Sequence, residues 1–188
     1  MSYVQRRRFL WILFLVGLAL IAVVASATTL SRLKLDDLAQ ESTAVARLRC
    51  LGSTSLWDQG EIWTETKFEV VQREKGALPG IVTVRLLGGS VGHLHSRVEE
   101  VPAFHSGEEV YLFLWSRGGE PYKVLGWSQG TFRIGRNPAT GLEVVNQDSA
   151  PAPIFDPRTH SFRRGGIRNL PVAIFREKLH KALRQERQ

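Results

Sequence analysis

The chain has 188 residues, which is room for one domain with appendages, and its 43% hydrophobic and 9% aromatic content is ordinary for a globular core. The formal net charge of +7 is unevenly distributed, because residues 158–188 contain nine Lys or Arg against two Glu, whereas residues 28–157 contain 13 against 16 acidic residues. The body is therefore mildly acidic and the cations lie in a tail, which argues against nucleic acid as a partner.

The N-terminus has the pattern of a secretory signal peptide. Three arginines precede the uncharged stretch Phe9–Val24, and Ala25-Ser26-Ala27 then provides the small residues that signal peptidase recognises. We predict that residues 1–27 are removed and that the mature protein is exported, to a periplasm or out of the cell. The alternative is an uncleaved membrane anchor formed by residues 9–24, which fall just short of the ~20 apolar residues that span a bilayer.

Helical spacing of Leu35 and Leu38, with two aspartates in the first turn, predicts a short amphipathic helix over residues 35–42. Alternation of apolar and polar residues predicts strands over residues 44–51, 61–73, 81–87, 107–115, 122–127, 131–134 and 142–145. Residues 53–60 are interpreted as a polar turn region. Cys50 is the only cysteine, so no intramolecular disulfide can form. Apolar residues alternate along the strand on the same face as Cys50, which predicts that its thiol is buried.

The stretch Gly107–Trp115 is the strongest strand signal and both of its faces are apolar. The two sets are Val110, Leu112 and Leu114 on one face and Tyr111, Phe113 and Trp115 on the other. Both faces therefore need cover, as in a closed barrel with another element lying across its outside.

Two long segments lack a clear period. Gly88–Gly107 is a glycine-rich connection, and loops of this length in compact domains are often functional or mobile. Residues 147–171, which contain several prolines, are predicted to be an irregular linker. Residues 172–188 then form a basic amphipathic helix whose apolar stripe, with Phe175 and Leu179 at its centre, is expected to dock on the barrel. The alternative is a basic helix lying on anionic lipid, and for the docked helix we expect only weak contact with an anionic membrane.

The order of these motifs along the chain resembles that of a known domain family. The segments Ser42-Thr-Ala-Val-Ala-Arg47, Lys67-Phe-Glu-Val-Val-Gln-Arg-Glu-Lys-Gly76 and Gly107-Glu-Glu-Val-Tyr-Leu-Phe-Leu114 resemble the netrin-like domain of tissue inhibitors of metalloproteinases and a group of exported bacterial proteins. The likeness covers roughly residues 33–135. It implies a mainly β fold with an OB-type closed barrel and flanking helices, as a domain over residues 28–146. The inhibitors chelate a target's zinc through a disulfide-held N-terminal cysteine, which this chain lacks, so inhibition is not carried over.

Candidate chemistry is sparse. His93, His95 and His105 have a spacing that could hold zinc or copper, although solvated histidines on a flexible loop are the simpler interpretation. Four tryptophans could line a sugar-binding or single-strand-binding face or simply pack under the helices: Trp57, Trp63, Trp115 and Trp127.

No catalytic motif is present, and no catalytic residue, cofactor or metal is assigned. The sequence favours an exported non-enzymatic binding module that contacts a protein or envelope component through Gly88–Gly107 and the neighbouring barrel rim. The alternative is a metal-binding or hydrolytic protein that uses the three histidines.

Overall fold

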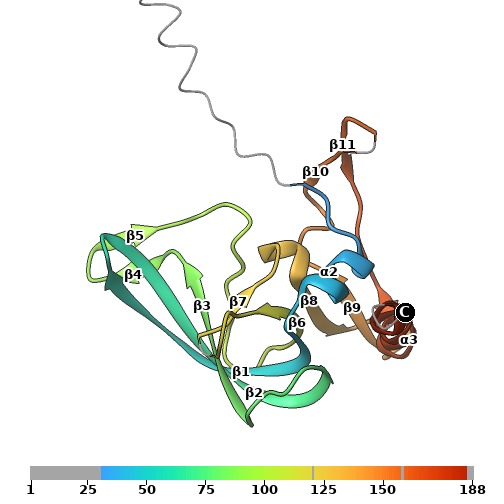
Figure 1. The fold of residues 1–188 in the computed structure, drawn as a ribbon, viewed down its shortest axis with the longest axis horizontal. Coiled ribbons are helices and arrows are strands. Elements are labelled where there is room, and N and C mark those ends of the chain that lie inside the picture. Colours follow the sequence, from blue (N-terminus) through green and yellow to red (C-terminus); the bar gives the residue numbers. More distant parts are fainter. Residues whose placement is uncertain (1–30, 120, 158, 186–188) are drawn as a thin grey trace, which may run out of the picture. The chain divides into compact units, whose positions relative to one another are not determined.

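The computed structural model describes residues 31–119, 121–157 and 159–185, so the predicted signal peptide at residues 1–27 lies outside the described residues. This part of the chain is mainly β (Figure 1), with helices α2 (Leu35–Glu41) and α3 (Val172–Gln185) and a short 3-10 helix η1 (Trp127–Gly130). The described elements belong to one compact unit, which begins at Ser31. That unit holds both hydrophobic cores described below, so it contains what it needs to fold on its own.

One large antiparallel sheet has the order β12-β9-β8-β6-β1-β2-β3, with β7 paired to β6, and β4–β5 and β10–β11 form two small hairpins. The bounds of the large sheet are β1 (Ala44–Asp58), β2 (Glu61–Lys75), β3 (Ile81–Leu87), β6 (Glu109–Trp115), β7 (Lys123–Val124), β8 (Thr131–Arg136), β9 (Glu143–Gln147) and β12 (Leu170–Pro171). The hairpins are β4 (Gly89–Val91) with β5 (Leu94–Ser96), and β10 (Pro153–Asp156) with β11 (Ser161–Arg164).

Strand β6 lies between β1 and β8 and contributes to two separate cores, as its sequence predicts. Val110, Leu112 and Leu114 are fully buried in the first core, with β1, β2 and β3. Tyr111 and Phe113 are fully buried in the second core, beneath the helices. The prediction of cover on both faces is confirmed because successive side chains of a strand point to opposite sides.

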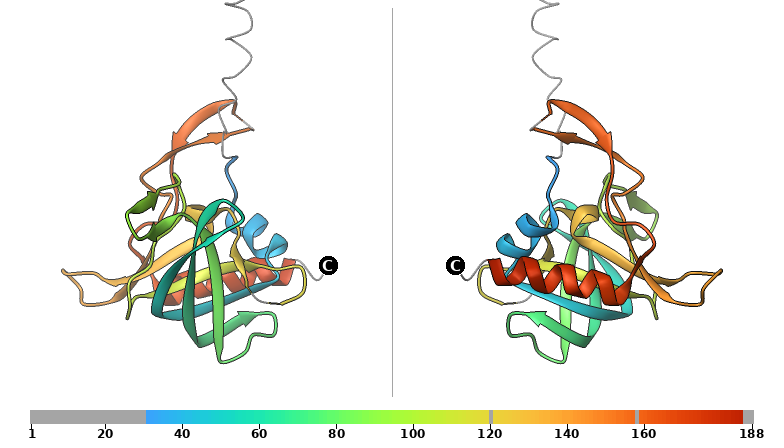
Figure 2. Two further views of the ribbon diagram at one scale, coloured as in Figure 1. Left: turned by 90° about the vertical axis from the view of Figure 1, so that its left-hand side faces the viewer. Right: turned by 90° about the vertical axis from the view of Figure 1, so that its right-hand side faces the viewer.

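The predicted docking of the C-terminal helix is also confirmed. Helix α3 lies across the strands next to α2 (Figure 2), and its Phe175 and Leu179 have no exposed surface. The ring of Phe175 lies 5.0 Å from that of Tyr111 and 5.1 Å from that of Phe132. Burial of such side chains contributes roughly 1.5–3 kcal/mol each, so the apolar stripe of α3 is committed to the fold.

The strand order does not close the sheet into a barrel. Of the predicted fold, the mainly β class and the flanking C-terminal helix are therefore confirmed, whereas the closed OB-type barrel is not. Strand β3 ends the order. An isolated parallel bridge joins Val84 of β3 to Tyr122. Its hydrogen bonds run from Arg85 N to Tyr122 O at 2.8 Å and from Tyr122 N to Thr83 O at 2.9 Å.

Four segments differ from their predictions. The strand predicted over residues 122–127 is reduced to Lys123–Val124, because Gly126 has a left-handed φ of 63° and Trp127 begins η1. Residues 53–60, interpreted as a turn, continue β1 to Asp58, and Gln59-Gly60 makes the turn with φ angles of 49° and 86°. Cross-strand hydroxyl pairs stabilise this half of the hairpin, although Ser and Thr in such a cluster usually indicate a turn. The long connection 88–107 contains the β4–β5 hairpin. Residues 147–171, expected to be an irregular linker, contain β10, β11 and β12, the last of which joins the main sheet.

Candidate functional site

A cleft of about 740 Å³ lies beneath the connection 88–107, which the sequence singled out as a contact surface. Its walls come from the inner face of the β1–β2 hairpin, from the chain between Leu86 and Phe104, and from Ser128, Arg133 and Asp148. Pockets of this size are typical of ligand sites. Its lining mixes hydroxyl and charged side chains with apolar ones, among them Leu86, Val101 and Phe104.

The floor of the cleft is a set of paired hydroxyl groups. Ser53 and Thr66 pair at 2.8 Å across the hairpin, and Ser55 and Thr64 pair at 2.9 Å. The Thr64 hydroxyl donates to the Gly88 carbonyl at 2.6 Å. A cavity floor made of hydroxyl groups can exchange hydrogen bonds with a polar ligand, because each hydroxyl is both donor and acceptor.

The β4–β5 hairpin is fitted onto this floor through a glycine. The Ser90 backbone N–H donates to Ser55 Oγ at 3.2 Å. At Gly89, which has φ of 133°, a Cβ atom would lie 2.3 Å from both Ser55 Oγ and Thr64 Oγ1. A larger residue at position 89 would therefore push the hairpin away from the cleft.

Arg133 of β8 organises the opposite wall. Its guanidinium donates to Glu108 at 2.7 Å, to both carboxylate oxygens of Asp148 at 2.8 and 2.9 Å, and to the Ala103 carbonyl at 2.7 Å. Arg133 also lies over the ring of Phe104, with 5.4 Å between Cζ and the ring centroid. One side chain thus ties the end of the 88–107 connection to β8 and to the chain that follows β9.

The carboxylates of this wall differ in their protonation behaviour. Burial raises the pKa of Asp148 above its ordinary value, and its bonds from Arg133 only partly offset that effect. Burial would also raise the pKa of Glu108, but hydrogen bonds from His105 and the charge of Arg133 outweigh burial and lower the pKa. Asp148 is therefore the carboxylate of this group that gives up its charge most readily.

Glu100 has an uncommon backbone conformation. Its φ of 64° lies in the left-handed region, which costs a residue other than glycine of order 1–3 kcal/mol. Contacts with η1 hold it there, because the Ser128 hydroxyl donates to the Glu100 carboxylate and the Ser128 N–H donates to the Glu100 carbonyl at 3.0 Å. The connection 88–107 is therefore fixed at its middle as well as at its end.

The three histidines have separate environments. His95 lines the cleft and pairs through Nδ1 with Ser90 Oγ at 2.8 Å. The His105 side chain is 81% exposed and pairs with Glu108 at 3.1 Å, and His93 is exposed in the β4–β5 turn. Within residues 31–119, 121–157 and 159–185, no group of three or more His, Cys, Asp or Glu is arranged to hold a metal ion.

The tryptophans also have different surroundings. Trp57 is 55% exposed at the end of the β1–β2 hairpin. The Arg85 guanidinium lies over the ring of Trp63 at 4.9 Å, and Arg117 lies over the ring of Trp115 at 5.7 Å. Trp127 is half-buried. None of the four lines the cleft in the described structure, and Phe104 is the aromatic side chain that does.

Sequence reasoning identified the connection 88–107 but missed the residues that face it. Arg133 and Asp148 come from distant parts of the chain, and no local pattern links them. The hydroxyl floor did leave a signal, because Thr64 and Thr66 alternate with outward residues on the face that also holds Phe68. Polar residues on an otherwise apolar strand face indicate either paired hydroxyls or a ligand site.

Comparison with family models, with curated proteins and with solved structures finds no match to this chain. In the described part of the chain, neither α2 nor α3 combines the length and the apolar character that a membrane-spanning helix needs.

Proposed function

We propose that this protein is an exported, non-enzymatic binding module and that its binding site is the cleft under residues 88–107. The observation that supports this most is the way the cleft is built. Arg133 and Ser128 fix the connection 88–107, at a backbone cost at Glu100, and they do so around a cleft of about 740 Å³ whose lining carries hydroxyl and charged groups. Rigid support around a concave polar surface is what a binding site requires.

The charge of the cleft indicates the kind of ligand. Glu99, Glu100 and Asp148 line it with two cations, Arg97 and Arg133. Arg133 and Asp148 pair with each other, which leaves Glu99 and Glu100 against Arg97, so the lining is net negative. We infer that the ligand is a segment of a partner protein or an envelope component that brings ammonium and hydroxyl groups to the cleft.

We interpret the architecture as an OB-type barrel, in line with the netrin-like resemblance. The support is that β1 pairs with β2 and β6, β2 pairs with β3, and β7 pairs with β6. The bridge between Val84 and Tyr122 would then join β3 to the residue just before β7. In this interpretation the cleft lies at the mouth of the barrel, where small barrels commonly bind ligands.

The alternative of a metal-binding or hydrolytic protein has less support. It would need His93, His95 and His105 to converge, and the two that have hydrogen bonds use Ser90 and Glu108 as separate partners. We therefore place no catalytic role on these side chains.

The test is an affinity capture from the native envelope with the form that spans residues 28–188. Ser53 and its neighbour Thr54 are both exposed, but only Ser53 lines the cleft, whereas Thr54 lies opposite Glu65 on the other face of the hairpin. A Ser53→Tyr variant should fill the cleft and lose the captured component, while Thr54→Tyr should retain it. Equal capture by both variants, with unchanged folding, would show that the cleft is not the binding site.

A further inference from the structure

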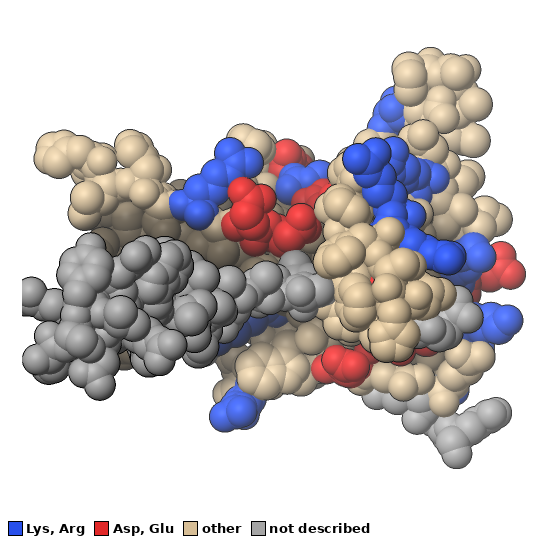
Figure 3. All heavy atoms as spheres, turned by 90° about the horizontal axis from the view of Figure 1, so that it is seen from above, with Lys and Arg blue, Asp and Glu red and all other residues tan. Residues whose placement is uncertain are grey.

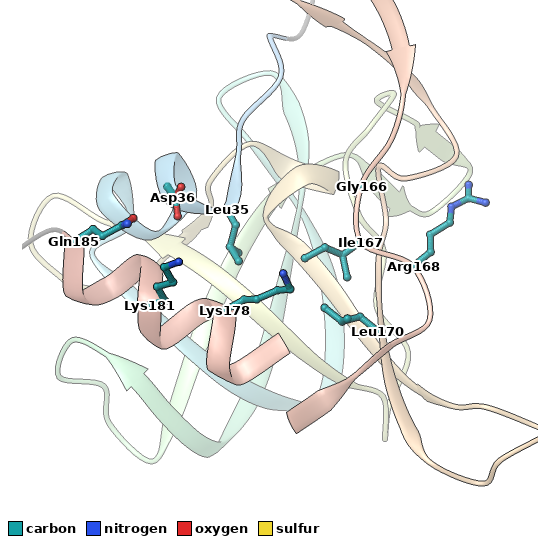
Figure 4. Close-up of a pocket in the computed structure, with 9 residues that line it drawn as sticks. All are labelled: Leu35, Asp36, Gly166, Ile167, Arg168, Leu170, Lys178, Lys181 and Gln185. Carbon is teal, nitrogen blue, oxygen red and sulfur yellow. The ribbon is translucent and has the colours of Figure 1, made fainter. Parts of the chain in front are cut away.

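A groove of about 560 Å³ lies between α2, α3 and residues 166–170, away from the residues that line the cleft (Figure 4). Its lining combines three partly buried apolar side chains with three cations: Leu35, Ile167 and Leu170 with Arg168, Lys178 and Lys181. One carboxylate, Asp36, lies at its edge. The groove is therefore basic over an apolar floor.

The two lysines are placed by the helix. Lys178 and Lys181 are three residues apart on α3, so they lie on the same side of it. Figure 4 shows Lys178 extending from α3 toward Ile167 and Lys181 extending toward α2, on the side of Asp36, whereas Arg168 extends away from the groove. Two ammonium groups thus point into the groove from one wall.

These cations are not used by the fold. Among the described residues, no hydrogen-bond or ion-pair partner is found for Lys178, Lys181 or Arg168. On the other flank of the same helix, Arg176 and His180 bind the buried carboxylate of Glu74 at 3.1 and 2.5 Å. Four arginines of the sheet are likewise paired with carboxylates: Arg47, Arg49, Arg85 and Arg133.

The helix dipole does not account for the lysines either. A cation is favoured near a helix C-terminus only within the last turn, which in α3 contains Arg184. Lys178 lies seven residues before the end of α3 at Gln185. Lys178, Lys181 and Arg168 are all solvent-exposed, so their charges are available to a ligand at the groove.

We propose that this groove binds the phosphate group of an anionic phospholipid. Lys178 and Lys181 contact the phosphate, while Leu35 and Ile167 contact the glycerol and the first part of the acyl chains. A phospholipid joins a negative charge directly to apolar atoms, which matches the groove, whereas a free phosphate or an acidic peptide would use the cations alone. This site is independent of the cleft and of the function proposed for it.

The surrounding surface supports the choice of a membrane lipid. Figure 3, which looks down on the molecule from above Figure 1, shows Lys and Arg side chains gathered on the right-hand side, which carries the β10–β11 hairpin. Residues 158–188 have nine cations against two carboxylates. Such a surface is drawn to anionic lipid, and because Phe175 and Leu179 are buried, contact is made through headgroups and not through the apolar stripe.

The test measures binding of monomeric short-chain phosphatidylglycerol to residues 28–188. The variant Lys178→Gln/Lys181→Gln removes the two groove cations, and Arg163→Gln/Arg164→Gln removes two exposed cations of β11, which do not line the groove. The groove variant should bind at least about tenfold more weakly, or about 1.4 kcal/mol. The β11 variant should bind nearly as well as the wild type. Equal losses in the two variants would mean diffuse attraction and would overturn the proposal.

Three further readouts make the test decisive. In the wild-type protein, lipid should shift the amide NMR signals of Leu35 and Ile167, and binding without those shifts would place the lipid elsewhere. Glycerol phosphate should compete only weakly, since equal competition would make the ligand a soluble phosphate. An oligoglutamate peptide that displaces the lipid at low concentration would identify an acidic protein partner instead. Either of these competition results would contradict the assignment.

Discussion

Arg133 donates hydrogen bonds to both carboxylate oxygens of Asp148, from Nε at 2.8 Å and from Nη2 at 2.9 Å. The pair joins β8 to the chain just after β9, and the same guanidinium reaches Glu108 and the Ala103 carbonyl at the end of the 88–107 connection. Because this side chain joins β8 to two other segments, the chain after β9 and residues 103–108, the shape of the cleft depends on it.

Asp148→Ala should therefore loosen the cleft as well as destabilise the protein. Loss of a bidentate partner of a half-buried arginine should lower the free energy of unfolding by about 1.5–3 kcal/mol, measured by urea denaturation. Hydrogen exchange at residues 97–104 should become faster. Glu143→Ala is the matched control, because Glu143 also forms a bidentate pair, with Arg47, but is 45% exposed and should cost about 0–1 kcal/mol. Equal costs and unchanged exchange would contradict this role of Arg133.

Glu109 should contribute stability that is lost in acid. Burial alone would raise its pKa, but hydrogen bonds and charges from Arg49 and Arg47 outweigh burial and lower the pKa below the ordinary value. A carboxylate with a lowered folded-state pKa stabilises the fold above its unfolded-state pKa of about 4.3, and this stability is lost as pH falls through the folded-state pKa. Wild type and Glu109→Gln should therefore differ most in unfolding free energy at pH 7.

That difference should shrink as the pH is lowered below about 4. Asp148 contributes with the opposite sign, because its pKa is raised, but it is present in both proteins and its contribution cancels. A difference that stays constant between pH 7 and pH 3 would show that the charge of Glu109 is not what stabilises the fold. Chemical denaturation at a series of pH values gives the comparison.

Phe175→Ala should cost much of the stability of the protein. The Phe175 ring is fully buried between Tyr111 and Phe132, and truncation of such a ring costs about 3–5 kcal/mol. Ile174, the preceding residue, is 43% exposed, and Ile174→Ala should change the unfolding free energy by no more than about 0.5 kcal/mol. Thermal or urea unfolding of the form that spans residues 28–188 compares the two. Similar, small effects would mean that α3 detaches readily from the sheet.

Cys50 should react slowly with a thiol reagent in the native protein. It is free, 1% exposed and part of the first core, and burial raises the pKa of its thiol. Since the thiolate is the reactive form, both access and ionisation limit the rate. The rate should rise by orders of magnitude in denaturing urea. Rapid labelling without denaturant would place Cys50 at the surface.

The sequence predicts elements whose signal is local. Alternation around Leu112 and helical spacing around Leu179 are properties of short stretches, and both elements have the buried faces that these patterns indicate. What could not be predicted is non-local. The pairing of Ser53 with Thr66 depends on the register of a hairpin whose serines look like a turn, and the contact of Arg133 with Asp148 depends on how β8 and β9 pair. For residues 172–188 the sequence predicts only a basic amphipathic helix, and the packing of α3 beside α2 shows what Lys178 and Lys181 face.

The most direct test of the binding cleft is site-specific photocrosslinking in the native envelope. A photoreactive amino acid such as p-benzoylphenylalanine would replace Ser53 on the cleft floor or, in a parallel sample, its neighbour Thr54, which does not line the cleft. We predict a discrete crosslinked product from position 53 and none from position 54. Products from both positions alike, or from position 54 alone, would contradict the assignment of the cleft as the binding site.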